Sequence, residues 1–363
     1  MSAIEEALAL VRGSVRGMDG YVPGLQPSPG QRLVKLNTNE NPYPPSPRVL
    51  EDLQRAIDGT LRLYPSPDAA SLRAAAAREY NITPLQVLCG NGSDEILALI
   101  MRALVDEGDT VSFFQPSYSL YPVMAAMAGA RTITVPLPRL RREADLLQLP
   151  VPSPRAKIFF LTTPNSPYGY AFPPAWTARL LSSFRGIVVA DEAYVDFAEE
   201  SSLSLLADNP RLLIVRSMSK SSSLAGMRVG FAFGHEEMIA QIMKVKDSYN
   251  VSRLAQVAAC AALEDRQYAR ETRDRIVATR EKLTRSLTAL GFTVMPSRAN
   301  FVFAVPPAGL DARALYEGLL RRGFLVRYFA SNGLSDGLRI SVGSDAEMDP
   351  LLAAIQGEQH GGQ

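Results

Sequence analysis

The sequence predicts an α/β protein whose large domain holds a mostly parallel mixed sheet flanked by helices, followed by a smaller α+β domain. Short apolar runs of strand length alternate with helical patterns from about residue 85 to residue 217, as in a parallel sheet covered on both faces. The chain has 363 residues, more than one hydrophobic core usually holds. We expect an N-terminal arm (1–40) that contributes to the small domain, a large domain (41–255) and a small C-terminal domain (256–363).

The individual elements follow from the spacing of apolar residues and from turn residues. Prolines in residues 37–45 exclude a helix or a central strand there. Strands are expected at 33–36, 87–89, 110–114, 132–135, 157–161, 187–190, 212–215 and 229–234. Helices are expected at 69–79, 96–104, 121–128, 173–183 and 202–207. Residues 236–290 contain no proline and suggest one long helical path between the domains. The small domain should then have strands within 291–305, 323–329 and 338–342 and a helix at 312–322.

Composition excludes several classes of function. A formal net charge of +1 gives no support for binding nucleic acid or an anionic membrane. Cys89 and Cys260 are too few and too far apart for a disulfide framework or a thiolate metal site. Only two histidines are present, which argues against a histidine metal site or a Ser-His-Asp triad. No apolar run approaches the roughly 20 residues of a membrane helix, and no secretory signal is recognisable. We expect a cytoplasmic protein that acts on small polar metabolites without a metal.

Polar side chains gather where the predicted strands end. Ligands of such sheets bind at the carboxyl ends of the strands. The residues that fall there are Ser93, Tyr118, Asn165, Asp191, Tyr194 and Lys220. The sequence therefore predicts one site at this edge of the sheet.

Lys220 is the residue around which we expect the chemistry to be organised. It follows a strand in the string Arg216-Ser217-Met218-Ser219-Lys220, with Arg228 close behind. A lysine amine can form a Schiff base with a carbonyl cofactor, and serine hydroxyls with an arginine can hold a phosphate. Both properties suit pyridoxal 5'-phosphate (PLP), and Asp191 is placed to keep the pyridinium nitrogen of PLP protonated.

The loop Gly90-Asn91-Gly92-Ser93-Asp94-Glu95 opens an amphipathic helix. Glycines, a capping hydroxyl and a helix N-terminus together make an anion site. Two nucleotide motifs do not match, because Glu95 stands where G-x-G-x-x-G has its third glycine and no Gly-Lys-Ser/Thr follows. The alternative is an ordinary glycine turn before a helix.

With the strings Asn39-Glu40-Asn41-Pro42 and Pro164-Asn165-Ser166-Pro167, these motifs stand in the order found in one family. From about Tyr21 to Gly343 the chain resembles the fold-type I PLP-dependent aminotransferases, and most closely the histidinol-phosphate aminotransferase family. The resemblance implies PLP as cofactor and a homodimer with shared active sites. It implies that Tyr64 reaches the cofactor phosphate of the neighbouring subunit.

The resemblance also implies roles for the remaining site residues. Lys220 would hold the cofactor and shuttle a proton, Asp191 would bond the ring nitrogen, and Tyr118 would lie against the ring. Tyr194 would bond the phenolic oxygen of the cofactor. Besides Tyr64, the residues implied for the cofactor phosphate are Gly92, Ser93, Asp94, Ser217, Ser219 and Arg228.

One position departs from the family pattern. Many members read Pro-Asn-Asn-Pro-Thr-Gly at 164–169, and the second asparagine bonds the phenolic oxygen of the cofactor. This chain has Ser166 there. Either Ser166 donates a weaker bond or Asn165 has taken over, and we prefer Asn165 because an amide donates over a longer reach.

The resemblance places substrate anions on two arginines in late strands. Arg339 matches the substrate-anion arginine and Arg327 the arginine associated with the substrate phosphate, although an arginine in an apolar strand is often merely snorkelling or paired. Tyr21, Asn39 and Asn300 are further pocket candidates.

The expected reaction is transamination of histidinol phosphate with 2-oxoglutarate, giving imidazole acetol phosphate and glutamate in histidine biosynthesis. The alternatives are an aromatic-amino-acid aminotransferase and a phosphothreonine-type PLP decarboxylase. A ligand-sensing regulator is disfavoured, because the chain leaves no room for a nucleic-acid-binding domain.

Overall fold

A seven-stranded sheet forms the centre of the large domain. The computed structural model describes residues 2–28, 30–152, 155–331 and 333–360. The strand order is β2-β8-β7-β6-β5-β3-β4. The strands are β2 (Val87–Gly90), β3 (Thr110–Gln115), β4 (Arg131–Pro136), β5 (Ile158–Thr162), β6 (Ile187–Asp191), β7 (Leu212–Ser217) and β8 (Gly230–Phe233). Only β8 runs antiparallel to its neighbours, which confirms the predicted mostly parallel sheet.

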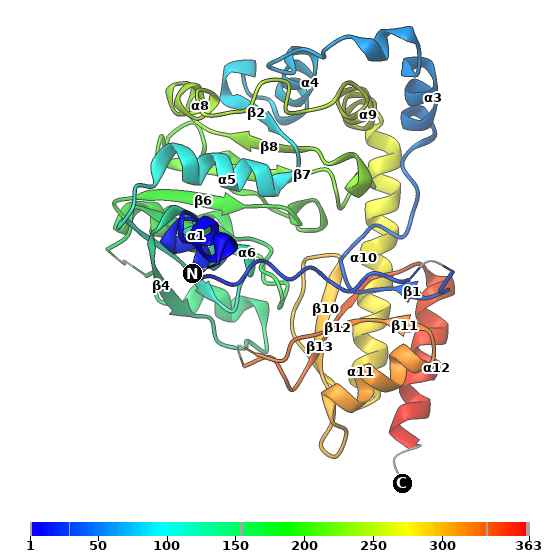
Figure 1. The fold of residues 1–363 in the computed structure, drawn as a ribbon. Coiled ribbons are helices and arrows are strands. Elements are labelled where there is room, and N and C mark those ends of the chain that lie inside the picture. Colours follow the sequence, from blue (N-terminus) through cyan, green and yellow to red (C-terminus); the bar gives the residue numbers. More distant parts are fainter. Residues whose placement is uncertain (1, 29, 153–154, 332, 361–363) are drawn as a thin grey trace.

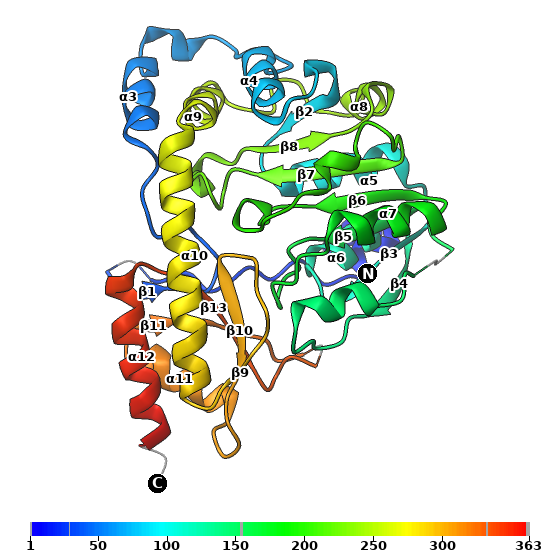
Figure 2. The same cartoon turned by 180° about the vertical axis from the view of Figure 1, so that it is seen from behind.

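Helices cover both faces of this sheet (Figures 1 and 2). Alternate residues of β5 point to opposite faces: Ile158 and Phe160 pack with one apolar cluster, Phe159 and Leu161 with the other. The first cluster includes residues of α5 (Ser93–Leu104), α6 (Leu120–Ala128) and α8 (Glu236–Met243). The second includes residues of α3 (Pro47–Ala56), α4 (Ala70–Tyr80), α7 (Pro174–Ser183) and α9 (Arg253–Glu264). Burial on both faces explains why these strands read as continuous apolar runs.

Over its described residues, the small domain combines two sheets with three helices. Its four-stranded antiparallel sheet has the order β12-β13-β10-β9. These strands are β9 (Thr293–Val294), β10 (Phe301–Val305), β12 (Arg327–Tyr328) and β13 (Leu338–Ser341). The N-terminal arm adds β1 (Val34–Lys35), which pairs in parallel with β11 (Phe324–Leu325). The helices are α10 (Arg266–Ala289), α11 (Ala312–Arg321) and α12 (Asp345–His360).

The expectation of one long helical path over 236–290 is wrong. Three helices occupy it, and residues 244–252 interrupt them with Tyr249 at a φ of 56°. Asn250 fixes this interruption, because its amide donates to the Cys89 carbonyl at 3.3 Å and to Glu95 Oε2 at 2.7 Å. Asp265 then separates α9 from α10 and caps α10 by accepting from the Tyr268 amide. Such tertiary contacts leave no periodic signal in the sequence.

Helix α10 is the element that joins the two domains (Figure 1). Helix α9 packs in the large-domain core through Ala255, Ala258 and Ala259. The expected boundary at residue 256 would cut through this helix. We therefore propose that the small domain begins with α10 and that the N-terminal arm joins it through β1. The start of the arm lies elsewhere, because α2 (Gly13–Arg16) packs on α6 of the large domain.

Candidate active site

A cleft between the domains brings most of the predicted site residues together. It encloses about 1420 Å³, counting the part open to solvent. The predicted residues that line it are Tyr21, Asn39, Ser93, Asp94, Tyr118, Ser166, Asp191, Tyr194, Ser217, Ser219, Lys220, Arg228, Arg327 and Arg339. Asn165, Asn300, Gly92 and Tyr64 do not line it. The carboxyl ends of the parallel strands thus supply much of the site, as the sequence predicts.

Lys220 lies just beyond β7 and projects into the cleft. Its Nζ donates to the Thr38 carbonyl at 3.0 Å and lies 5.6 Å from the ring centre of Tyr194. Asn41 holds the loop from the other side, because its Nδ2 donates to the carbonyls of Lys220 and Ser221, each at 3.0 Å. The amine is therefore held at the pocket wall by a neutral partner.

Asp191 ends β6 at the floor of the cleft. Its side chain is buried, and burial raises its pKa to about 6. Tyr121 Oη donates to Asp191 Oδ2 at 2.7 Å, and the Ala193 amide donates to Oδ1 at 3.3 Å. The sequence analysis assigned Tyr121 no part in the site and so missed this bond. The one signal was its position three residues after Tyr118, whose ring it meets edge-on with ring centres 5.7 Å apart.

An anion cradle forms where α5 begins. Gly92 precedes the helix with a φ of +88°, and a Cβ there would lie 2.6 Å from Arg228 Nη2. A Cβ on Gly230 would meet the Gly92 carbonyl carbon and the Ser93 nitrogen at 2.7 Å. Arg228 itself has a φ of 55° and reaches Asp94 Oδ2 at 3.3 Å and Ser219 Oγ at 3.5 Å. Two glycines thus let the helix N-terminus and a guanidinium converge, which suits a phosphate.

Tyr118 and Asn39 are held in place by polar partners. Tyr118 Oη donates to Asp94 Oδ1 at 2.9 Å, and its ring meets Tyr21 edge-on at 6.0 Å. Asn39 Nδ2 donates to Tyr194 Oη at 3.0 Å, while its Oδ1 accepts from Ser341 Oγ at 2.9 Å. Both ends of the Asn39 amide are engaged, so this side chain orients Tyr194 within the pocket.

The preference for Asn165 over Ser166 is corrected by the contacts. Asn165 is buried outside the cleft: its Nδ2 donates to the Pro116 carbonyl at 3.3 Å and its Oδ1 accepts from the Tyr168 amide. Ser166 lines the cleft and its Oγ accepts from Arg339 Nη1 at 3.0 Å. The hydroxyl proton of Ser166 is then available to a ligand. The longer reach of the Asn165 side chain was the wrong criterion for this choice. Its amide is held by backbone groups outside the cleft and does not face a ligand there.

Two arginines face each other across the small-domain sheet. Arg327 and Arg339 are directly opposite in the β12–β13 pairing. Arg339 Nη2 donates to the Asn37 carbonyl at 2.7 Å, whereas its Nε is buried without a hydrogen-bond partner. Within the described chain neither guanidinium has an acidic partner, and burial lowers the pKa of Arg339. Like charges opposite each other are unfavourable, so this pair calls for an anion in the cleft.

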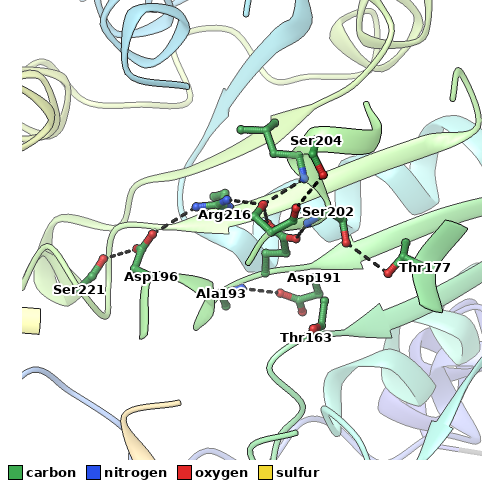
Figure 3. Close-up of polar contacts among 12 residues, drawn as sticks. Thr163, Thr177, Asp191, Ala193, Asp196, Ser202, Ser204, Arg216 and Ser221 are labelled. Atoms are coloured by element: carbon green, nitrogen blue, oxygen red, sulfur yellow. Dashed lines mark hydrogen bonds and ion pairs between the residues drawn. The ribbon is translucent and has the colours of Figure 1, made fainter. Parts of the chain in front are cut away.

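A buried ion-pair network, which the sequence did not reveal, supports the lysine loop. Figure 3 shows Arg216 bonded to Asp196, which accepts from the Ser221 hydroxyl. Arg216 Nε also donates to Glu192 Oε2 at 2.9 Å, and both side chains are buried. The network ties the ends of β6 and β7 to the residue that follows Lys220.

Tyr64 points away from the cleft of its own chain. It is 80% exposed and stacks on Tyr249 with ring centres 4.5 Å apart. Ile57, Leu61 and Leu63 are exposed beside it in sequence. We call these five residues the Tyr64 patch.

The donor set of the cleft fits PLP. An amine, a buried carboxylate, a tyrosine ring and a cradle with a guanidinium match the aldehyde, ring nitrogen, ring face and phosphate of that molecule. Over the described ranges, no group of three or more His, Cys, Asp or Glu residues could hold a metal ion. In the same ranges no helix is long and apolar enough to cross a membrane.

Fold and site define a class I and II aminotransferase, since the model of that family matches residues 31–355. Similar proteins are the histidinol-phosphate aminotransferase of Geotalea daltonii, 43% identical over 95% of this chain and 98% of that one, and histidinol-phosphate aminotransferase 1 of Burkholderia pseudomallei, 46% identical over 94% and 96%. The crystal structure of the Sinorhizobium meliloti histidinol-phosphate aminotransferase in complex with PLP superposes with a TM-score of 0.86, at 26% identity over 97% and 98% of the two chains. The chain belongs to the histidinol-phosphate aminotransferase family, which confirms the resemblance seen in the sequence.

Proposed function

We propose that the protein transfers the amino group of histidinol phosphate to 2-oxoglutarate, giving imidazole acetol phosphate and glutamate in cytoplasmic histidine biosynthesis. The observation that carries this proposal is the opposed pair Arg327 and Arg339, two cations without an acidic partner at the cleft. Both substrates bear anionic groups, a phosphate on one and carboxylates on the other. A planar guanidinium binds either with two parallel hydrogen bonds.

The cofactor is PLP, held from four sides by this chain. Its phosphate would lie in the cradle of residues 92–94, Ser217, Ser219 and Arg228. Tyr118 would cover the ring, and Tyr194 and Ser166 would bond the phenolic oxygen. When bound, PLP supplies an electron-withdrawing ring that acidifies the hydrogen on the amino carbon of the substrate.

The residues of the chain move and hold the protons of the reaction. Lys220 Nζ would hold the cofactor aldehyde and, as a free amine, would take the proton from the amino carbon of the substrate. The Thr38 carbonyl keeps this amine at the pocket wall. Asp191 would hold a proton at the ring nitrogen. Its buried position excludes water from that contact and so strengthens it.

Substrate anions would be divided between the two arginines. Arg339 already donates to Ser166, beside the place assigned to the cofactor, and so suits the α-carboxylate of 2-oxoglutarate and glutamate. Arg327 has no described hydrogen-bond or ion-pair partner and suits the phosphate of the larger substrate. Tyr21, at the rim beside Tyr118, would close over the substrate.

The working form is a homodimer with shared active sites. The residues of the Tyr64 patch are exposed large apolar side chains, which a second copy would cover, and Tyr64 does not line the cleft of its own chain. Packing a second copy on this patch would bring Tyr64 to the partner's phosphate cradle.

Substrate competition tests the proposal. Purified protein supplied with PLP and 2-oxoglutarate is offered histidinol phosphate, phenylalanine or phosphothreonine, and glutamate formation and carbon dioxide release are measured. Histidinol phosphate should have the highest kcat/KM. Preference for phenylalanine would support the aromatic aminotransferase, and carbon dioxide from phosphothreonine would support the decarboxylase.

A further inference from the structure

At the floor of the cleft, hydroxyl groups form a continuous chain of hydrogen bonds that ends at Asp191. The hydroxyls of Ser117 and Thr162 lie 3.0 Å apart. Thr162 Oγ1 lies 2.7 Å from Tyr121 Oη, which donates to Asp191 Oδ2 at 2.7 Å. The chain joins the loop after β3, the end of β5, the start of α6 and the end of β6. Four elements that converge at the site are thereby tied to one carboxylate.

Tyr121 acts on Asp191 from outside the cleft. Ser117, Thr162 and Asp191 line the cleft, whereas Tyr121 does not. Its side chain is fully buried, stacked on Phe160 at 4.7 Å and tilted against Phe113 at 5.6 Å. Packing therefore fixes the direction of its hydroxyl, so that Tyr121 cannot serve as a ligand for substrate and can only act through Asp191.

The direction of each hydrogen bond follows from the number of hydroxyl protons available. An ionised carboxylate only accepts, so the single hydroxyl proton of Tyr121 belongs to Asp191. Tyr121 Oη then accepts the proton of Thr162, whose oxygen can accept that of Ser117. A donor polarised by an incoming hydrogen bond gives a stronger bond, by roughly 10–30%. The three hydroxyls thus all stabilise the negative charge on Asp191.

We propose that Tyr121, assisted by Thr162, is a positioning residue that keeps Asp191 ionised and holds its carboxylate towards the cofactor ring nitrogen. This inference rests on the proposed function, which assigns Asp191 to that nitrogen. The surroundings oppose ionisation: burial raises the pKa of Asp191 to about 6, and Asp94 and Glu192 raise it as well, whereas the Tyr121 bond lowers it. The other titratable groups that line the cleft are Glu40, Tyr21, Tyr118, Tyr194, Lys220, Arg228, Arg327 and Arg339.

The test compares the wild type with Tyr121→Phe in the protein without cofactor. Aspartate carboxyls are labelled with carbon-13 and titrated by NMR, and the Asp191 signal is identified by its loss in Asp191→Asn. Tyr121→Phe should raise the pKa of Asp191 by about one unit, the size expected for losing one hydrogen bond to a charged group. PLP titrated into the same samples should bind about tenfold more weakly to Tyr121→Phe.

Two further variants separate positioning from packing. Tyr170→Phe is the matched control, because Tyr170 is equally buried but its hydroxyl accepts from the Leu140 amide at 2.6 Å, away from the cleft. It should lower Tm and leave the Asp191 titration and PLP affinity unchanged. Thr162→Val should raise the Asp191 pKa less than Tyr121→Phe does. If Tyr121→Phe does not fold, Thr162→Val alone tests whether these hydroxyls influence Asp191.

An Asp191 titration that is the same in wild type, Tyr121→Phe and Thr162→Val would overturn the inference. So would a shift of equal size in Tyr170→Phe. A different result would refute the proposed function, namely a wild-type protein that binds no PLP. In that case the titration of the Asp191 carboxyl still decides the role of Tyr121.

Discussion

Replacing Arg327 by alanine should damage recognition of the phosphorylated substrate without weakening the fold. Arg327 has no described ion pair, and its cross-strand neighbour Arg339 carries the same charge. Removing it therefore leaves no buried partner unpaired and relieves a repulsion. A charge-assisted hydrogen bond contributes roughly 1.5–3 kcal/mol, which corresponds to a loss of about 10- to 150-fold in kcat/KM. Tm should stay the same or rise slightly.

Steady-state kinetics with histidinol phosphate, phenylalanine and glutamate measure this effect alongside thermal unfolding. Arg327→Ala should lose far more with histidinol phosphate than with the other two, and Arg327→Lys should recover part of the loss because it keeps the charge but not the fork. Arg339→Ala should lose activity with all three, since it removes the bonds to Ser166 and Asn37 as well. Equal losses with phenylalanine and histidinol phosphate in Arg327→Ala would refute the phosphate role, and a fall in Tm alone would point to a purely structural arginine.

Three further predictions concern the buried network, the floor carboxylate and the dimer. Glu192→Gln should lower the free energy of unfolding by roughly 3–5 kcal/mol, because it leaves Arg216 buried and part-paired; urea denaturation that detects less than 1 kcal/mol would contradict this. Asp191 has a pKa raised from 3.8 to about 6, so it binds a proton more tightly when folded, and the cofactor-free protein should lose stability as pH rises from about 4 to about 6. Asp191→Asn should flatten that part of the stability curve, and an unchanged slope would exclude Asp191 as its source. Tyr64→Ala should weaken PLP binding, and mixing it with Lys220→Ala should restore one working site per mixed dimer; a fully active monomer in sedimentation would refute the shared site.

The sequence predicted the sheet and most of the site because both depend on local order. Apolar runs alternate with helical patterns, and the carboxyl ends of parallel strands meet at one edge, so the sequence alone places Asp191 and Lys220 at the same edge. A strand that is buried on both faces also reads as a continuous apolar run, which can be recognised without knowledge of its neighbours.

The contacts that were missed depend on long-range packing. Whether Asn165 or Ser166 faces the cleft is decided by the carbonyl of Pro116 and the amide of Tyr168, neither of which a motif reveals. The bond from Tyr121 to Asp191 joins residues on different elements, and the helix break near Tyr249 depends on contacts made by Asn250. Each of these features depends on contacts between residues far apart in the sequence, which the periodicity of apolar residues does not reveal.

Trapping the cofactor on its lysine is the measurement that decides whether Lys220 carries the reaction. The purified protein is mixed with PLP, reduced with borohydride and digested, and the labelled peptide is sequenced by mass spectrometry, with Lys220→Ala treated in parallel. We expect a visible absorbance band that reduction removes and a label on Lys220 alone, both absent from Lys220→Ala. A label on another lysine, or no PLP binding by the wild-type protein, would contradict the assignment of this cleft as the active site.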